Sequence, residues 1–323
     1  MSENSTVRSR TAVHSIDHFA LNVPSVSTAQ DFFSAFGLNI SRIDDELELR
    51  ASDNHRWARV LPAASKSLAY LSFNCYDGDL PAIERQARES GASFDVESNL
   101  KNDRGIWFYD VDGNLIQVQH GPKTTPTVKI PVLHRDAPAD ARGSCTRTQA
   151  QTVHPRRLSH ILLFTPDVLR AVDFYHRAIG LNLSDKSVDI IAFMHGAHGS
   201  DHHLVAFAKS TAKGWHHSAW DVVNVDEVGQ GSAQMSQAGF SNGWGTGRHV
   251  LGSNYFHYVQ DPWGSFAEYS ADIDFVTAGA QWPAGDFAPE DSLYLWGPNV
   301  PDYFIHNTEA VSVNDAAVSI GST

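Results

Sequence analysis

Residues 248–269 read RHVLGSNYFHYVQDPWGSFAEY, and they determine how the rest of the chain is interpreted. Residues 261–264, DPWG, have the composition of a turn, because proline fixes φ and glycine accepts the positive φ of tight turns. Alternating residues on both sides of the turn predict a β-hairpin. In this hairpin Glu268 shares a face with Phe266, and Tyr258 on the other strand can face the same interior. Unless the register is shifted, such a carboxylate indicates a ligand held in a buried site.

Composition limits the classes of protein to which the chain can belong. The chain has 323 residues, of which 42% are hydrophobic, enough for two domains with cores of their own. Its formal charge is −13 and it has no long Lys/Arg cluster, so we expect a small-molecule partner and no nucleic acid. Residues 1–15 are polar and no run of about 18 apolar residues occurs, so we expect no membrane. Cys75 and Cys145 are the only cysteines, which predicts no thiolate metal site and suits the cytoplasm.

Each half of the chain begins with a strand, a proline and a helix. Residues 16–42 read IDHFALNVPSVSTAQDFFSAFGLNISR, and residues 158–185 read LSHILLFTPDVLRAVDFYHRAIGLNLSD. The two segments align almost residue for residue. Apolar residues at helical spacing from Val168 to Ile179 predict a helix with Thr165 as its N-cap and Pro166 as its first helical residue, closed by Gly180.

Two further segments have the same order and end in a hairpin with a D-x-x-G turn. They comprise residues 68–94 followed by 107–121, and residues 215–240 followed by 255–271. Their helices are predicted at 80–91 and 225–239, where glycine ends each one. One module is therefore used four times. We predict an α+β fold in which four βαβββ modules pair into two domains, each a curved mixed sheet with its helices outside.

The two halves differ at three positions that the repeat makes equivalent. The second half has His160, His217 and Glu268 at these positions. The first half has His18, Tyr70 and Gln117. A single histidine in a strand is usually an ordinary core or surface residue, but two histidines and a carboxylate at equivalent positions are the ligand set of non-heme Fe(II) oxygenases. We therefore predict one metal site, in the second half only.

The most specific motifs are WHHSAWDV at 215–222 and GRHVLGSNYFHYVQDPWGSFAEY at 247–269. With them, residues 16–274 resemble the type I extradiol ring-cleavage dioxygenases of the vicinal oxygen chelate superfamily, which include catechol 2,3-dioxygenases and dihydroxybiphenyl dioxygenases. The aromatic segment LYLWGPNVP at 293–301 also resembles a C-terminal segment found in part of that family.

The resemblance implies a catalytic site and a reaction. The implied metal ligands are His160, His217 and Glu268, which would hold Fe(II), or alternatively Mn(II). The implied catalytic residues are His203 as acid-base group, with Tyr258 and His249 near the substrate oxygens. The expected reaction is extradiol (meta) cleavage of a catechol, with dioxygen as co-substrate, in a homo-oligomer that takes part in aromatic catabolism.

The remaining histidines leave alternatives open. His202 and His203 precede a strand and can equally form a solvated edge, and His249 can be a loop residue that pairs with a carboxylate. His198 and His202 do not match the acid-base position of the family, and His195 has no assigned role.

The same comparison of halves predicts the domain organisation. We expect residues 1–121 to form an N-terminal scaffold domain without metal, and residues 156–275 a C-terminal catalytic metal domain. Residues 122–155 lack periodicity and are expected to be a linker, and residues 276–323 a tail whose last residues are mobile. Two other functions fit this fold. A glyoxalase-like metalloisomerase would need His18 and Gln117 as ligands, and a non-catalytic ligand-binding protein would need no ligands.

Overall fold

The computed structural model describes residues 10–133 and 137–310 of the chain. The elements of the first half are β1 (Val13–Val23), α1 (Val26–Ala35), β2 (Asn39–Ile43), β3 (Glu46–Arg50), β4 (Arg56–Pro62), β5 (Ser67–Cys75), α2 (Leu80–Glu89), β6 (Ile106–Tyr109) and β7 (Leu115–His120). The later elements are η1 (Arg147–Gln149), β8 (Arg157–Thr165), α3 (Val168–Ile179), β9 (Asn182–Ser187), β10 (Ile191–His195), β11 (Ser200–Asp201), β12 (Val205–Lys209), β13 (Gly214–Asp221), α4 (Val225–Gln237), β14 (Gly243–His249), β15 (Tyr255–Gln260), β16 (Phe266–Ala271), β17 (Phe275–Val276), β18 (Gly285–Asp286), η2 (Pro289–Asp291), β19 (Tyr294–Trp296) and η3 (Asp302–Ile305). The predicted mobility of the last residues concerns 311–323, which lie outside the described residues.

The first half forms a seven-stranded mixed sheet in the order β2-β3-β4-β1-β5-β7-β6. Its two modules meet at the antiparallel ladder between β1 and β5. The first module, β1-α1-β2-β3-β4, has three strands after its helix, as predicted. The second module, β5-α2-β6-β7, has only two, because residues 94–105 form no strand and a single bridge joins Ser93 to Tyr109.

The second half forms a ten-stranded mixed sheet in the order β18-β9-β10-β12-β8-β13-β16-β15-β14-β19. Its modules, β8-α3-β9-β10-β12 and β13-α4-β14-β15-β16, meet at the antiparallel β8–β13 ladder. The tail adds the edge strands β18 and β19, and β11 pairs with β17 in a separate small sheet. The predicted α+β class, with repeated modules paired into two mixed sheets, is therefore confirmed.

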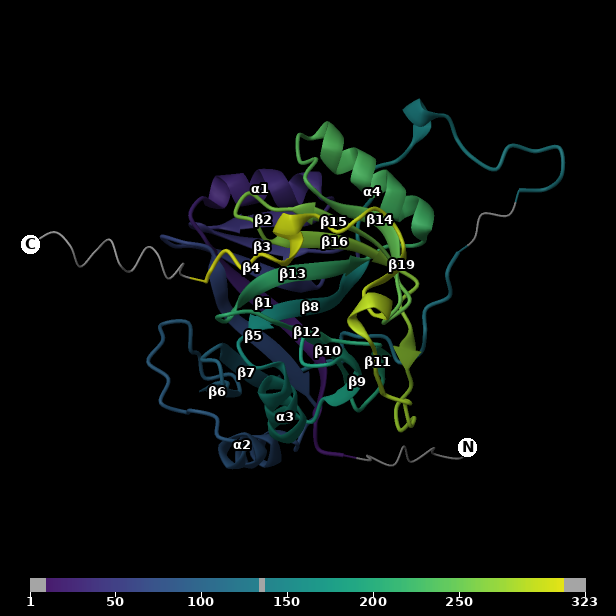
Figure 1. Ribbon diagram of the computed structural model, residues 1–323. Helices are drawn as coiled ribbons and strands as arrows, with labels where there is room; N and C mark the ends of the chain where they lie inside the picture. Colours follow the sequence, from purple (N-terminus) through teal and green to yellow (C-terminus); the bar gives the residue numbers. More distant parts are fainter. Residues whose placement is uncertain (1–9, 134–136, 311–323) are drawn as a thin grey trace, which may run out of the picture.

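The α-helices of the described chain lie outside the sheets in two pairs (Figure 1). Helix α1 lies beside α4, where the Gln234 side chain donates to the Ala35 carbonyl at 2.8 Å. Helix α2 lies beside α3. Each pair joins the two halves of the chain, because α1 and α2 come from the first half and α3 and α4 from the second.

The N-terminus of α3 differs from the sequence prediction. Asp167 is the N-cap, and its carboxylate accepts a hydrogen bond from the Arg170 amide at 3.0 Å. Thr165 is not the cap, because it is the last residue of β8. The predicted C-terminus is correct, since Gly180 ends the helix with φ 79°, a left-handed conformation that glycine adopts without strain.

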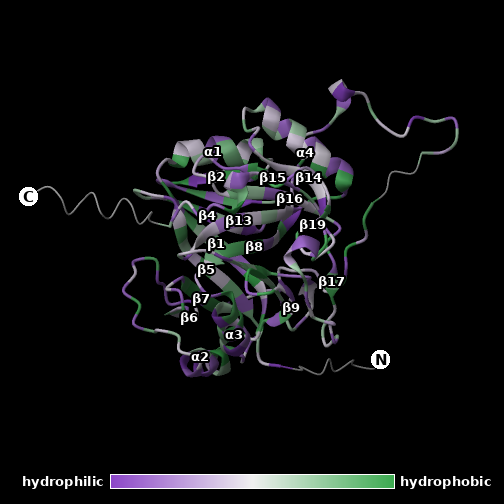
Figure 2. Ribbon diagram, in the orientation of Figure 1, coloured by the Kyte–Doolittle hydropathy of each residue, from purple (hydrophilic) through white to green (hydrophobic). Residues whose placement is uncertain are grey.

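One hydrophobic core extends through both halves. Phe19 of β1 packs on Trp215 of β13 with ring centroids 4.8 Å apart. Strands such as β5 and β8 carry mostly hydrophobic residues, whereas α2 is largely hydrophilic (Figure 2). Among the described residues, no helix has the length and apolar character needed to cross a membrane.

Candidate metal centre

Strand register brings the three predicted ligands to one place. Ala219 of β13 pairs with His160 of β8 on one side and with Glu268 of β16 on the other, so these three side chains share a face. His217 precedes Ala219 by two residues and points the same way. The repeat makes this register predictable, because His18, Ser72 and Gln117 pair in the same way in the first sheet.

The three side chains are buried and close together. Glu268 Oε2 lies 3.4 Å from His160 Nε2 and 3.5 Å from His217 Nε2. Their potential ligand atoms all lie within 4.8 Å of one another, and no other group of this kind occurs among residues 10–133 and 137–310. The residues are 0–3% exposed.

Hydrogen bonds fix the tautomer of His217. The ring of His216 lies with Nε2 2.8 Å from the Phe304 carbonyl, which can only accept, so this nitrogen carries the proton. His216 Nδ1 is then the acceptor for His217 Nδ1, which lies 2.6 Å away and must donate. The lone pair of His217 is therefore on Nε2, the atom that faces Glu268.

The same reasoning fixes the tautomer of His160. The Ser159 hydroxyl donates to Asp201 at 2.9 Å, and Arg157 holds this carboxylate with a contact of 2.7 Å. Ser159 Oγ therefore accepts from His160 Nδ1, which lies 3.1 Å away. The lone pair of His160 is on Nε2, and it also faces Glu268.

When Glu268 is ionised, three acceptors thus point at one another without a donor between them. Among the described residues, neither His217 Nε2 nor Glu268 Oε2 has a hydrogen-bond partner. Burial lowers the pKa of His160 to about 3 and raises the pKa of Glu268 to about 7. Two neutral imidazoles and a carboxylate in this arrangement fit a divalent cation, which would satisfy all three groups at once.

Tyr258 and His249 lie beside this cluster. Tyr258 pairs with Glu268 across the β15–β16 ladder, so the predicted common face is confirmed. His249 Nδ1 lies 2.7 Å from the Leu293 carbonyl and must donate to it, which leaves Nε2 to accept from the Tyr258 hydroxyl at 2.9 Å. Burial, together with the nearby Glu268, raises the pKa of Tyr258 well above its usual value, so the phenol remains a donor.

His203 packs beside the predicted ligands, with its ring centroid 3.9 Å from that of His160 and the two rings tilted by 51°. Burial lowers the pKa of His203 well below its usual value. His202 and His203 are 0% and 3% exposed, so the solvated-edge alternative is wrong. The Ser184 hydroxyl donates to the His202 carbonyl and accepts from His195 Nδ1, 2.7 Å away. His198 packs on Tyr76 with ring centroids 4.9 Å apart.

A cavity of about 270 Å³ opens beside the cluster. Its polar wall consists mainly of His160, His203, His217, His249, Asn254 and Tyr258. Its apolar wall includes Leu162, Phe164, Ile191, Phe193, Leu251, Leu293, Phe304 and Ile305. This size is near the lower end for small-molecule sites, so the cavity fits a compact, largely apolar molecule with polar atoms at one end.

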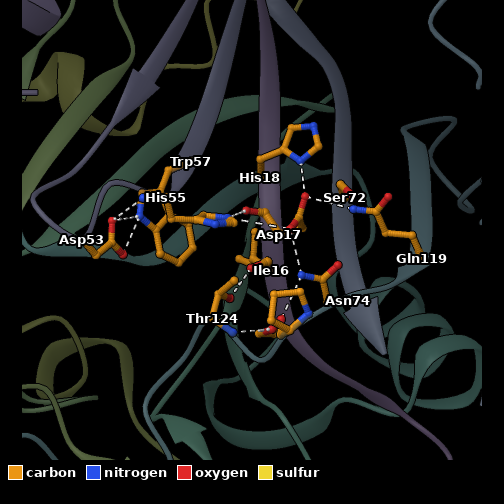
Figure 3. A network of polar contacts seen from close by, with 12 residues as sticks. Ile16, Asp17, His18, Asp53, His55, Trp57, Ser72, Asn74, Gln119 and Thr124 are labelled. Carbon is orange, nitrogen blue, oxygen red and sulfur yellow. Dashed lines mark hydrogen bonds and ion pairs between the residues drawn. The ribbon is translucent and has the colours of Figure 1, made fainter. Parts of the chain in front are cut away.

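The equivalent positions of the first half are closed by the protein's own groups. His18 Nε2 lies 2.7 Å from the Tyr70 hydroxyl, and His18 Nδ1 lies 2.6 Å from Asp17. Figure 3 shows Asp17 at the centre of a polar network that also includes Asn74 and Gln119. His18 Nδ1 donates to the Asp17 carboxylate, so the lone pair of His18 is on Nε2, where it accepts from the Tyr70 hydroxyl.

Several residues of the site were not found by sequence reasoning. His216 and Phe304 fix the orientation of His217, and Asn254 donates to Glu268 Oε1 at 3.0 Å. Phe304 is 88 positions from His216, so only the fold brings the two together. The sequence signal for Asn254 was its place in the quoted hairpin stretch, before Tyr255 of β15.

Comparisons with known proteins agree with this fold. Residues 157–269 match the model of the Glyoxalase/Bleomycin resistance protein/Dioxygenase superfamily. The chain is 58% identical over 309 residues to metapyrocatechase 2 of Cupriavidus necator. The aligned residues make up 96% of this chain and 97% of that protein.

Two solved structures have the same fold. The Mn(II)-bound glyoxalase from Novosphingobium aromaticivorans superposes with a TM-score of 0.73 at 22% sequence identity. The superposition covers 94% of this chain and 99% of the glyoxalase chain. An extradiol ring-cleaving dioxygenase from B. fuscum superposes with a TM-score of 0.72 at 18% sequence identity. The superposition covers 94% of this chain and 84% of the dioxygenase chain. At these identities the two likenesses show the fold alone. The 58% identity to metapyrocatechase 2 over 96% of the chain establishes that the chain belongs to the metapyrocatechase family of extradiol ring-cleavage dioxygenases.

Proposed function

We propose that this protein opens the ring of a catechol by extradiol cleavage with dioxygen, at one Fe(II) held by His160, His217 and Glu268. The observation that carries this proposal is the set of three buried acceptors that face one another without a donor. The relative from C. necator, named metapyrocatechase, supports the reaction. Both oxygen atoms of dioxygen enter one product, which makes the protein an oxidoreductase.

The ligand set supports iron over manganese only by analogy with the 2-His-1-carboxylate oxygenases. Mn(II) accepts the same donors, and the glyoxalase of similar fold is Mn(II)-bound. The chemistry supplied by the bound metal is chelation of both diol oxygens and activation of dioxygen beside them. The metal-binding domain of this proposal comprises residues 156–275, and residues 1–121 are its scaffold.

The surrounding residues handle the protons of the substrate. His203 lines the cavity beside His160, where it can accept a hydroxyl proton of the catechol and return it to a leaving oxygen. The Tyr258 hydroxyl donates a hydrogen bond to His249 Nε2. It can turn this donor toward a substrate oxygen that becomes negatively charged.

The walls of the cavity favour an uncharged ring substituent. Apart from histidine, Lys209 is the one ionisable basic residue among the described residues that line it. Its ammonium group is paired with Asp189 in an exposed position, so it offers no buried partner for a substrate carboxylate. Leu162, Phe193 and Ile305 provide apolar contact instead.

The glyoxalase-like alternative receives less support. It would require ligands from both halves, but His18 and Gln117 are engaged in the first sheet, where Gln117 accepts from Ser72 at 2.9 Å and donates to the Arg104 carbonyl at 2.9 Å. A ligand-binding protein without a metal would leave the acceptor cluster uncompensated. We further propose that the protein is cytoplasmic, in keeping with its two free cysteines. We also propose that it is a homo-oligomer.

The test is anaerobic loading of the protein with Fe(II), followed by a panel of catechols with oxygen uptake and the yellow ring-cleavage product recorded together. We expect one dioxygen consumed for each catechol cleaved. Oxygen uptake without ring cleavage, or isomerisation of a thiohemiacetal without oxygen, would reject the proposed reaction. Parallel loading with Mn(II) and Fe(II) decides which metal supports turnover.

A further inference from the structure

His202 connects the cavity to a carboxylate that the proposed reaction has not used. Its ring is 0% exposed, and its Nε2 lies 2.8 Å from Asp185 Oδ2. Its other nitrogen, Nδ1, lies 3.0 Å from Nδ1 of His203. The three side chains therefore form a continuous chain of hydrogen bonds from Asp185 to the acid-base candidate.

Asp185 is held in place by the tail of the protein. Its Oδ1 accepts from the Gly285 amide at 2.7 Å, and its Oδ2 accepts from Trp282 Nε1 at 3.3 Å. The indole of Trp282 also packs edge-on against the His202 ring, with centroids 5.3 Å apart. A carboxylate with three donors around it stays an acceptor, so its bond to His202 has one direction.

That direction fixes the proton on each ring. A carboxylate can only accept, so Nε2 of His202 carries the proton, and the Nδ1 that faces His203 is the acceptor of the His202 ring. His203 must then donate from its own Nδ1. The lone pair of His203 is left on Nε2, the ring nitrogen that the chain of hydrogen bonds does not use, and His203 lines the cavity.

We propose that Asp185 and His202 are positioning residues that hold His203 as its Nδ1–H tautomer, so that Nε2 can take the hydroxyl proton of the bound catechol. This inference rests on the proposed function. The opposite tautomer would present an N–H to the substrate hydroxyl and would have no lone pair for its proton. In the step itself, the catechol O–H bond breaks, its proton forms a new N–H bond at Nε2, and the electron pair stays on the substrate oxygen.

The first measurement is the tautomer itself. Nitrogen NMR of the histidine-labelled, metal-free protein distinguishes protonated from unprotonated ring nitrogens, and loss of a signal set in His203→Phe assigns His203. We expect the proton on Nδ1 of His203 and the lone pair on Nε2. A proton on Nε2 in the wild-type protein would overturn the proposal, whether or not any variant folds.

The second measurement compares two variants of one residue. His202→Phe removes both hydrogen bonds, whereas His202→Gln keeps an amide donor for Asp185 and a carbonyl acceptor for His203. We expect the phenylalanine variant to lower kcat by about 10–100-fold, the usual effect of losing an outer-sphere partner, with iron content and anaerobic catechol affinity unchanged. The glutamine variant should recover most of the loss.

A matched control is Ser184→Ala, because the Ser184 hydroxyl donates to the His202 backbone carbonyl but does not contact the ring chain. It should leave kcat near the wild-type value. Equal losses in the phenylalanine and glutamine variants, or wild-type kcat in both, would overturn the positioning role. If no catechol supports oxygen uptake in the wild-type enzyme, the proposed function fails, and the NMR result still decides the tautomer.

Discussion

His18 Nε2 lies 2.7 Å from the Tyr70 hydroxyl, at the two strand positions that carry His160 and His217 in the second half. The hydroxyl fills the space in front of this imidazole, and burial lowers the pKa of His18, so the ring stays neutral. The same fold thus contains one closed polar cluster and one cluster of unmatched acceptors.

This difference predicts one metal ion per chain, held only in the second half. Loading with excess Fe(II) under anaerobic conditions, followed by desalting and elemental analysis, should give a ratio near one, because the first half offers no free lone pair like that of His217. A ratio near two would mean that the Tyr70 hydroxyl moves aside and that the first half also binds metal.

Removal of a ligand should remove metal and turnover together. We expect His217→Ala and Glu268→Ala to weaken metal binding by more than about 100-fold, since even the loss of an outer-sphere partner costs about 10–100-fold. Metal titrations and oxygen uptake on the same preparations measure both effects.

The matched control is His18→Ala, the equivalent histidine of the first half. It should lower the free energy of unfolding by about 1–3 kcal/mol through the lost hydrogen bonds, and leave metal content and turnover largely intact. If His217→Ala retains full metal content and rate, the ligand assignment is wrong and His216 becomes the candidate.

His203 should be needed for chemistry and not for metal binding. His203→Phe is expected to retain iron and anaerobic catechol affinity while turnover falls by about 10²–10⁴-fold, the usual contribution of a positioned acid-base group. Unchanged turnover would exclude the role. Loss of iron from the variant would indicate that His203 is itself a metal ligand, because its ring lies only 3.9 Å from that of His160.

Metal affinity should depend on pH through Glu268. Burial raises the pKa of this carboxyl to about 7, so in the metal-free protein it holds a proton below that pH, and a metal must displace the proton to bind. Apparent affinity should therefore fall about tenfold per pH unit below 7 and level off above it. Calorimetry in buffers of different ionisation enthalpy should show about one proton released at pH 6 and almost none at pH 8. Affinity independent of pH between 6 and 8 would contradict this.

The sequence predicted those features that repetition and strand periodicity control. Aligning the modules identified His160, His217 and Glu268, which correspond to His18, Tyr70 and Gln117 of the first half. Period-two alternation placed Tyr258 and Glu268 toward the same interior, which their pairing in the structure confirms. Both inferences depend on local spacing, which the strand geometry preserves.

Features that depend on contacts between distant segments could not be predicted. Phe304, in the tail, contacts His216, and Asp185 of β9 contacts His202, which lies 17 positions later in the chain. The N-cap of α3 was misplaced because β8 continues through Thr165, which is a tertiary effect of the sheet. The module β5-α2-β6-β7 lacks its predicted third strand, because residues 94–105 form no ladder with a neighbouring strand.

The most direct test of the metal assignment is an anomalous difference map from crystals of the Fe(II)-loaded protein, recorded on both sides of the iron absorption edge. We predict a single iron peak per chain, within bonding distance of His160 Nε2, His217 Nε2 and a carboxylate oxygen of Glu268. A peak beside His18 and Tyr70, or a loaded and active protein with no peak among these three residues, would contradict the assignment.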